Sequence, residues 1–336
     1  MSLTTPANGS STTDATPTFA GTGGTAGGDL ATVTVKVYNG TSATGSPTRT
    51  VTATRDPGNG AYSVDLPTAL GGGTYTAQAE QADSAGNVGT SSANTFVVES
   101  PYRTAIMADN PGGYWRLGEA FGTTAADETG ANPGTYQNGA VLAQPGALAV
   151  DANTAASFDG VNDIVSVPSS ASLNATTGVT MEAWVKRSKS GAWQNVLAKP
   201  GNGATASQNY ALWINTTNQP AAFFGNGSSS VGVYGPAIDT NWHHVAATYD
   251  NATAKMYVDG VLQASVNSNI NLTANTGALT IGRTTDNNRI FGGLLDEPAV
   301  YRATLSAARI QAHFAKGNAI DNVAPVVTLS TPTNGS

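Results

Sequence analysis

Three histidines are the first candidates for acid–base or metal chemistry in this sequence, which contains no cysteine. His243 and His244 are neighbours, so on a strand they point to opposite faces, and His313 stands far from both. The sequence has neither a His-Glu-x-x-His motif nor a Gly-x-Ser-x-Gly turn. These residues therefore predict neither a zinc site nor a serine hydrolase, and the missing cysteine excludes disulfides and thiolate chemistry.

The carboxylates do not form a hydrolytic pair either. Glycosidases need two carboxyl groups facing one sugar bond. Glu182 stands alone in its apolar surroundings, and Asp296 and Glu297 are adjacent, so a regular strand would point them to opposite faces. We therefore predict that the chain is not an enzyme.

One short loop offers the oxygen atoms that a hard cation prefers. Calcium is bound by six to eight oxygens, which combine carboxylates with backbone carbonyls of tight turns. Asp159-Gly160-Val161-Asn162-Asp163 supplies both kinds. The alternative is that Asp159-Gly160 is only a hairpin turn and that Asp296 caps a backbone amide.

Aromatic residues are the candidates for ligand binding. Sugars stack on aromatic faces, while amides and carboxylates bond their hydroxyl groups. In the run 210–214 alternate residues share one face, which leaves Trp213 on the other face. The candidate platforms are Trp193, Trp213, Phe224 and Tyr234. The alternative for each is packing in the protein core.

Composition indicates a turn-rich all-β protein. The 336 residues include 39 Gly and 16 Pro between short apolar runs, and the formal net charge is −7. A negative net charge argues against binding to nucleic acid or to anionic membranes. The apolar runs are too short to span a membrane. The composition also resembles that of bacterial surface proteins, so we expect an extracellular or cell-surface location.

Short alternating runs predict the elements that must position these residues. About seven strand-like runs between residues 16 and 98 indicate a two-sheet sandwich. Residues 242–266 predict three consecutive strands, with Asp259-Gly260 as a two-residue hairpin turn. Ser306 is a predicted N-cap of a helix near the end of the chain, with Ile310 and Phe314 facing a sheet.

Several motifs resemble known bacterial families. The run GTYTAQAEQADSAGNVGTSS resembles the closing hairpin of bacterial immunoglobulin-like domains. Residues 102–317 resemble laminin-G-like modules of the concanavalin A-like lectin/glucanase architecture. The motifs that carry this second resemblance occur in the family's order and are YWRLGEA, AASFDGVNDIVSVP, GVTMEAWVKRS, WHHVAATYD, KMYVDG and GGLLDEPAVY.

The resemblances imply two all-β domains. We expect an immunoglobulin-like β-sandwich over residues 1–100 and a jelly-roll β-sandwich with a short C-terminal helix over 101–318. Residues 328–336 repeat the pattern of 2–10, so we expect 319–336 to be a linker and the start of a further immunoglobulin-like repeat. The chain would then be a monomeric part of a longer multidomain protein.

The laminin-G-like resemblance also implies a calcium site. Such modules often hold a structural calcium in the loop that corresponds to residues 159–163, joined by an aspartate of the closing strand. Carried over to this sequence, the ligands are Asp159, Gly160 through its carbonyl, Asn162, Asp163 and Asp296.

We therefore expect a calcium-stabilised, non-catalytic module that binds carbohydrate or a cell-surface glycan. Two alternatives remain at this stage. The chain could be a structural stalk of an adhesin without a small ligand, or an accessory module of a glycoside hydrolase whose catalytic domain lies elsewhere. A common fold does not decide between them, because this architecture hosts many functions.

Overall fold

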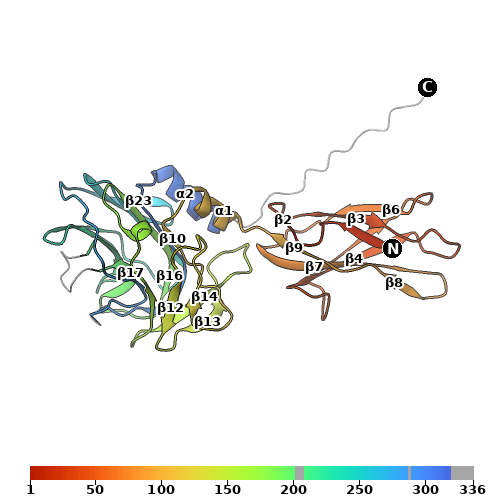
Figure 1. The fold of residues 1–336 in the computed structure, drawn as a ribbon, viewed down its shortest axis with the longest axis horizontal. Coiled ribbons are helices and arrows are strands. Elements are labelled where there is room, and N and C mark those ends of the chain that lie inside the picture. Colours follow the sequence, from red (N-terminus) through yellow and green to blue (C-terminus); the bar gives the residue numbers. More distant parts are fainter. Residues whose placement is uncertain (201–207, 287–288, 319–336) are drawn as a thin grey trace, which may run out of the picture. The chain divides into compact units, whose positions relative to one another are not determined.

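The structure is a computed structural model that describes residues 1–200, 208–286 and 289–318. Two compact units divide the described chain, Met1–Ser100 and Pro101–Asn318 (Figure 1). The further repeat predicted at residues 319–336 lies outside the described residues.

The first unit is a sandwich of two sheets. One sheet has the order β1 (Ser2–Thr5), β3 (Thr18–Thr22) and β6 (Ala61–Asp65). The other has the order β2 (Ser10–Thr12), β9 (Asn94–Val98), β7 (Gly73–Ala82), β4 (Thr32–Asn39) and β5 (Arg49–Thr54), with β8 (Val88–Thr90) on β7. Phe19 of one sheet and Phe96 of the other meet edge to face, 6.0 Å apart, inside the apolar core. The seven strands from β3 to β9 match the number of runs predicted between residues 16 and 98.

The second unit contains two larger sheets. The sheet that we call helix-covered has the order β13 (Val141–Pro145), β14 (Thr154–Asp159), β25 (Gly292–Tyr301), β16 (Val179–Arg187), β21 (His243–Tyr249), β22 (Thr253–Val258) and β23 (Val261–Asn267), with β10 (Gly113–Tyr114) on β25. The sheet that we call the second sheet has the order β11 (Thr124–Ala125), β12 (Gly134–Gln137), β15 (Ile164–Val167), β24 (Leu279–Ile281), β17 (Gln194–Lys199), β18 (Tyr210–Ile214), β19 (Pro220–Gly225) and β20 (Ser230–Tyr234). The remaining elements are α1 (Pro101–Ala108), α2 (Ala307–Gly317) and the 3₁₀ turn η1 (Ala171–Leu173). The all-β fold class and the C-terminal helix are thus confirmed.

Side chains of both sheets share one core between them. Met181 and Val185 of β16 and Leu212 and Ile214 of β18 belong to the same buried cluster, in which Phe224 stacks on Tyr249 of the opposite sheet at 5.0 Å. Because successive side chains of a strand alternate between faces, the intervening residues point outward from each sheet. These outward side chains form the two outer faces of the sandwich, where a ligand could bind.

The predicted meander forms β21, β22 and β23 of the helix-covered sheet. Asp259 and Gly260 both have positive φ, 51° and 74°, and Val258 pairs with Val261 across the turn. This is the two-residue hairpin that the Asp-Gly pair predicts.

The two helices lie side by side (Figure 1). Ser306 caps α2 as predicted, because its Oγ accepts the backbone N–H of Arg309 at 3.3 Å. Ile310 is fully buried, and Phe314 stacks on Trp184 of the helix-covered sheet at 5.8 Å. Among the described helices, none has the length and apolar character needed to cross a membrane.

A buried carboxylate joins α2 to the helix-covered sheet. Glu182 is fully buried, and its Oε2 lies 3.0 Å from Nε2 of His244 on the neighbouring strand. Its Oε1 accepts the hydroxyl of Tyr301 and lies 3.0 Å from Nδ1 of His313 in α2. The other ring nitrogen of His313 lies 3.0 Å from Asp109, which directly follows α1. Glu182 is isolated in the sequence, and no local pattern there predicts that it is the centre of this network.

A strand irregularity brings two further buried carboxylates together. The pairing of β16 with β25 shifts at Glu297, which has a φ of 56°. Asp296 therefore accepts the N–H of Ala147, while Glu297 binds Arg116 and accepts the hydroxyl of Tyr114. Both carboxylates are buried. Leu295 and Val300 both lie in the core between the sheets although they are five residues apart, so alternation is broken between them and the expectation drawn for a regular strand does not apply. Burial raises the pKa of Glu297 to about 7.

We expect His313→Gln to destabilise the second unit in a pH-dependent way. Burial disfavours the charged imidazole of His313, but Glu182 and Asp109 outweigh burial and raise its pKa above 6.5. The stabilisation is therefore complete below pH 6.5 and is lost as the pH rises through the raised pKa. At low pH the loss in free energy of unfolding should be about 3–5 kcal/mol, because the variant removes the charged partner of a buried carboxylate and leaves it with His244 and Tyr301.

Urea unfolding of the wild type and the variant across this pH range measures the difference. Glu128→Gln removes a partly exposed pair with Arg103 and serves as the control, with an expected loss of at most about 1 kcal/mol. A loss for His313→Gln that does not change with pH would contradict the assignment.

Candidate ligand-binding site

The outer face of the second sheet carries a cluster of aromatic side chains. In β18, Trp213 points away from the core side that Leu212 occupies. Across the sheet Trp213 is opposite Ala221 in β19, and Ala221 is opposite Tyr234 in β20. The small alanine leaves room between the two aromatic residues of this row.

Phe223 is the centre of the cluster. Its ring centroid lies 4.9 Å from that of Trp213, 5.8 Å from that of Tyr234 and 5.9 Å from that of Trp193. Gly232 lies opposite Phe223, and a Cβ at that position would come within 2.8 Å of the ring. The glycine therefore allows the ring to lie against the backbone of β20. We call Trp193, Trp213, Phe223 and Tyr234 the aromatic cluster.

The four members of the aromatic cluster differ in exposure. Tyr234 exposes 43% of its surface, and Trp193 and Phe223 are half-buried. Trp213 exposes only 3%, and its indole N–H donates to Asn195 Oδ1 at 3.0 Å. Trp213 is thus a fixed base on which the more exposed rings pack.

The structure corrects one predicted platform. Phe224 is fully buried in the core against Tyr249, and the outward residue is Phe223. The register follows from the hairpin between β18 and β19, where Trp213 pairs with Ala221, so that Phe223, two residues on, shares the face of Trp213. With this hairpin register, the sequence would have predicted Phe223 as the outward residue. Trp193, Trp213 and Tyr234 do come together as members of one cluster.

A cation lies over the aromatic cluster. The guanidinium of Arg289 is 4.0 Å from the ring centroid of Trp213 and 6.0 Å from that of Trp193. Its Nη1 is 3.9 Å from Asp286 Oδ2, a distance too long for a hydrogen bond. Burial lowers the pKa of Arg289 below its ordinary value. Spacing in the sequence gives no signal that Arg289 would reach the tryptophans.

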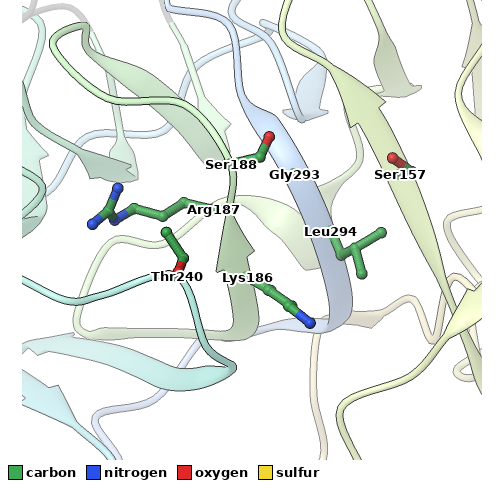
Figure 2. A pocket seen from close by; sticks show the side chains of 7 residues that line it. All are labelled: Ser157, Lys186, Arg187, Ser188, Thr240, Gly293 and Leu294. Atoms are coloured by element: carbon green, nitrogen blue, oxygen red, sulfur yellow. The ribbon is translucent and has the colours of Figure 1, made fainter.

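A depression lies on the other sheet, at the end of the helix-covered sheet where Lys186 pairs with Leu294 (Figure 2). Its volume is ≈ 470 Å³, and it is lined by Ser157, Lys186, Ser188, Thr240, Gly293 and Leu294. Arg187 also borders it but donates twice to the carbonyl of Ile238, at 2.9 and 2.7 Å. The depression is open and lacks an aromatic surface, so it offers a sugar ring little stacking energy.

The predicted calcium loop is a hydrogen-bonded turn. Asp159 Oδ1 accepts the N–H groups of Val161 and Asn162, at 2.7 and 3.3 Å. Asp163 Oδ2 in turn accepts the N–H of Asp159 at 2.8 Å. The Gly160 carbonyl accepts the Lys189 ammonium at 2.8 Å. The backbone carbonyl of Asn162, at 3.0 Å, accepts the Asn138 side chain.

Asp296 does not join this loop. Asp159 pairs with Gly292, and Asp296 lies four residues further along β25, roughly 13 Å away at 3.3 Å per residue. Within the described ranges, no group of three or more acidic, histidine or cysteine side chains is arranged to hold a metal ion. The residues predicted as calcium ligands therefore do not fit a single calcium site.

Comparison with protein families agrees with the two units. Residues 4–100 match the family model of bacterial Ig-like domains, and residues 159–311 match that of the concanavalin A-like lectin/glucanases superfamily. The chain is therefore composed of a bacterial Ig-like domain followed by a concanavalin A-like domain, which confirms both resemblances. A search of curated proteins gives no match.

Several solved structures are similar to parts of the chain. Domain 4 of AbnA, an extracellular arabinanase of Geobacillus stearothermophilus solved with arabinotriose, is 20% identical, with a TM-score of 0.45 over 60% of this chain and 97% of that one. The botulinum neurotoxin serotype D binding domain is 12% identical, with a TM-score of 0.49 over 62% and 52%. The binding domain of Paraclostridial Mosquitocidal Protein 1 is 13% identical, with a TM-score of 0.40 over 48% and 43%. The chain thus spans about half the length of these two toxin domains.

The two neighbouring phenylalanines should respond differently to truncation. We expect Phe224→Ala to lower the free energy of unfolding by about 3–5 kcal/mol, because it leaves a cavity against Tyr249 in the core. Phe223→Ala should cost about 1–2 kcal/mol, since its ring is half-buried on the outer face. Denaturant titrations of the two variants measure the difference, and equal losses would contradict the observed register.

Calcium should not stabilise the protein. Most of the oxygen donors of the 159–163 loop already accept protein hydrogen bonds, and Asp163 Oδ1 is a buried exception without a partner among the described residues. Since calcium needs six to eight oxygens, we expect the melting temperatures in EGTA and in excess calcium to agree within about 1 °C. Scanning calorimetry of the full chain measures both. A rise of several degrees with calcium that is lost in Asp163→Asn would restore the predicted site.

Proposed function

We propose that the chain is a non-catalytic binding module for carbohydrate, part of an extracellular or surface-attached bacterial protein that recognises a glycan. The observation that carries this proposal is the aromatic cluster on the outer face of the second sheet. Its four rings come from three strands and from Trp193, which directly precedes β17.

Carbohydrate is the ligand class that this surface fits best. A sugar ring presents C–H groups on its faces and hydroxyls on its rim, so it binds where aromatic faces lie beside polar donors and acceptors. Tyr234 supplies both an exposed ring and a hydroxyl, and Arg289 places a charged donor beside Trp193. Trp213, fixed by Asn195, supports the cluster from below.

The carboxylates of the second unit support a non-catalytic role. Glu182, Asp296 and Glu297 are buried and accept hydrogen bonds from other protein groups. A glycosidase needs its acid and its base exposed to the sugar bond. The match to a superfamily of lectins and glucanases is compatible with either activity, and the burial of these acids favours the lectin-like alternative.

We expect Tyr234→Ala to weaken glycan binding about tenfold, which corresponds to a loss of about 1.4 kcal/mol for an exposed aromatic contact. Binding is measured by affinity electrophoresis of the full chain in gels that contain a panel of soluble polysaccharides. Phe121→Ala is the matched control, because Phe121 is 88% exposed but does not belong to the aromatic cluster. The proposed function would be contradicted if no polysaccharide of the panel retards the protein, or if Tyr234→Ala and Phe121→Ala lose the same amount of binding.

A further inference from the structure

We propose that Arg289 makes the aromatic cluster selective for acidic glycans, by binding the carboxylate of a uronic or sialic acid residue. This inference rests on the proposed function and adds the class of ligand. It begins from a cation that lies against two tryptophans of the aromatic cluster.

The charge of Arg289 is poorly compensated by the protein. Among the described residues its ion-pair partner is Asp286, whose carboxylate is 3.9 Å away. The Nε of Arg289 is buried and has no hydrogen-bond partner in the described part of the chain. Burial of a guanidinium is unfavourable unless its donors are satisfied, so an anionic ligand would complete this site.

The position of the guanidinium over the Trp213 ring also limits the directions in which it can offer hydrogen bonds to such a ligand. A guanidinium held against an aromatic face keeps its N–H donors in its own plane, where a carboxylate accepts two of them at once. Trp213, the base of the stack, is itself held by the hydrogen bond from its indole to Asn195. The cation is therefore positioned before a ligand arrives, which reduces the entropy lost on binding.

The position of Arg289 relative to the other rings matches a sugar acid. Its guanidinium lies over Trp213, which contacts both Trp193 and Phe223, and Phe223 contacts the exposed Tyr234. A pyranose ring on the exposed aromatic side chains would direct a carboxylate substituent to Arg289. The formal net charge of −7 gives the chain no general attraction for anions, so the selectivity must come from this local cation.

A pair of ligands that differ only in charge tests the inference. Isothermal titration of the full chain is carried out with polygalacturonate and with its fully methyl-esterified form, and separately with 3′-sialyllactose and lactose. We expect an acidic ligand to bind at least tenfold more tightly than its neutral counterpart. The first pair tests uronic acids and the second tests sialic acids, so the pair that shows the preference identifies the source of the carboxylate.

Variants assign the preference to one side chain. Arg289→Gln should abolish it, and Arg289→Lys should restore it only in part, because an ammonium does not bind a carboxylate through a planar pair of donors. Lys186→Gln removes the same charge from the depression on the other sheet and should leave the preference unchanged. The wild-type comparison needs no variant and so remains decisive if Arg289→Gln alters folding.

The outcomes separate this inference from the proposed function. Equal binding of acidic and neutral ligands that Tyr234→Ala weakens would overturn the role of Arg289 and leave carbohydrate binding in place. A preference that survives in Arg289→Gln, or that Lys186→Gln removes, would also overturn the role of Arg289. If neither the acidic nor the neutral ligands bind, the role of Arg289 is overturned, and the polysaccharide panel decides the proposed function separately.

Discussion

The buried carboxylate of Glu182 holds α2 against the helix-covered sheet of the second unit. An isolated charge is unstable in a protein interior, so Glu182 must be surrounded by partners. It obtains them from His244 and Tyr301 on neighbouring strands and from His313 in α2. Burial by itself would raise the pKa of Glu182, but the neighbouring His313 and the side-chain hydrogen bonds with His244 and His313 lower it below its ordinary value, so the carboxylate stays ionised. The helix that follows the last strand is thereby held on the outer face of the helix-covered sheet.

This arrangement distinguishes the two outer faces of the sandwich. The helix-covered sheet packs Trp184 beneath Phe314, so this aromatic surface is used for folding. The second sheet presents the aromatic cluster on its outer face, with Tyr234 exposed and Arg289 beside it. Two sheets with similar alternation thus use their outward aromatic residues differently, because only one of them is covered by the helices.

Local patterns in the sequence predicted much of the fold. The Asp259-Gly260 turn and the Ser306 cap depend on a few neighbouring residues, and both form as expected. Trp193, Trp213 and Tyr234, which the sequence offered as separate candidates, lie in one cluster, and their role in ligand binding stays a prediction. The prediction that Phe224 is an outward-facing aromatic residue was wrong by one position, because the hairpin of β19 with β18 sets the register of β19. Contacts between distant segments, such as Glu182 with His313 or Arg289 with Trp213, depend on the complete sheet order, and alternation does not reveal them.

The central claim is that ligands bind on the outer face of the second sheet, and the five tryptophan indole N–H signals test it most directly. In a ¹H–¹⁵N NMR titration of the full chain with an acidic oligosaccharide, the signals of Trp193 and Trp213 should shift. Those of Trp115, whose indole is bonded to Asn132 in the interior, and of Trp184, beneath Phe314, should stay in place. Shifts confined to Trp184 and Trp242, or no shift at any tryptophan under conditions where the ligand binds, would place the site elsewhere and contradict the account.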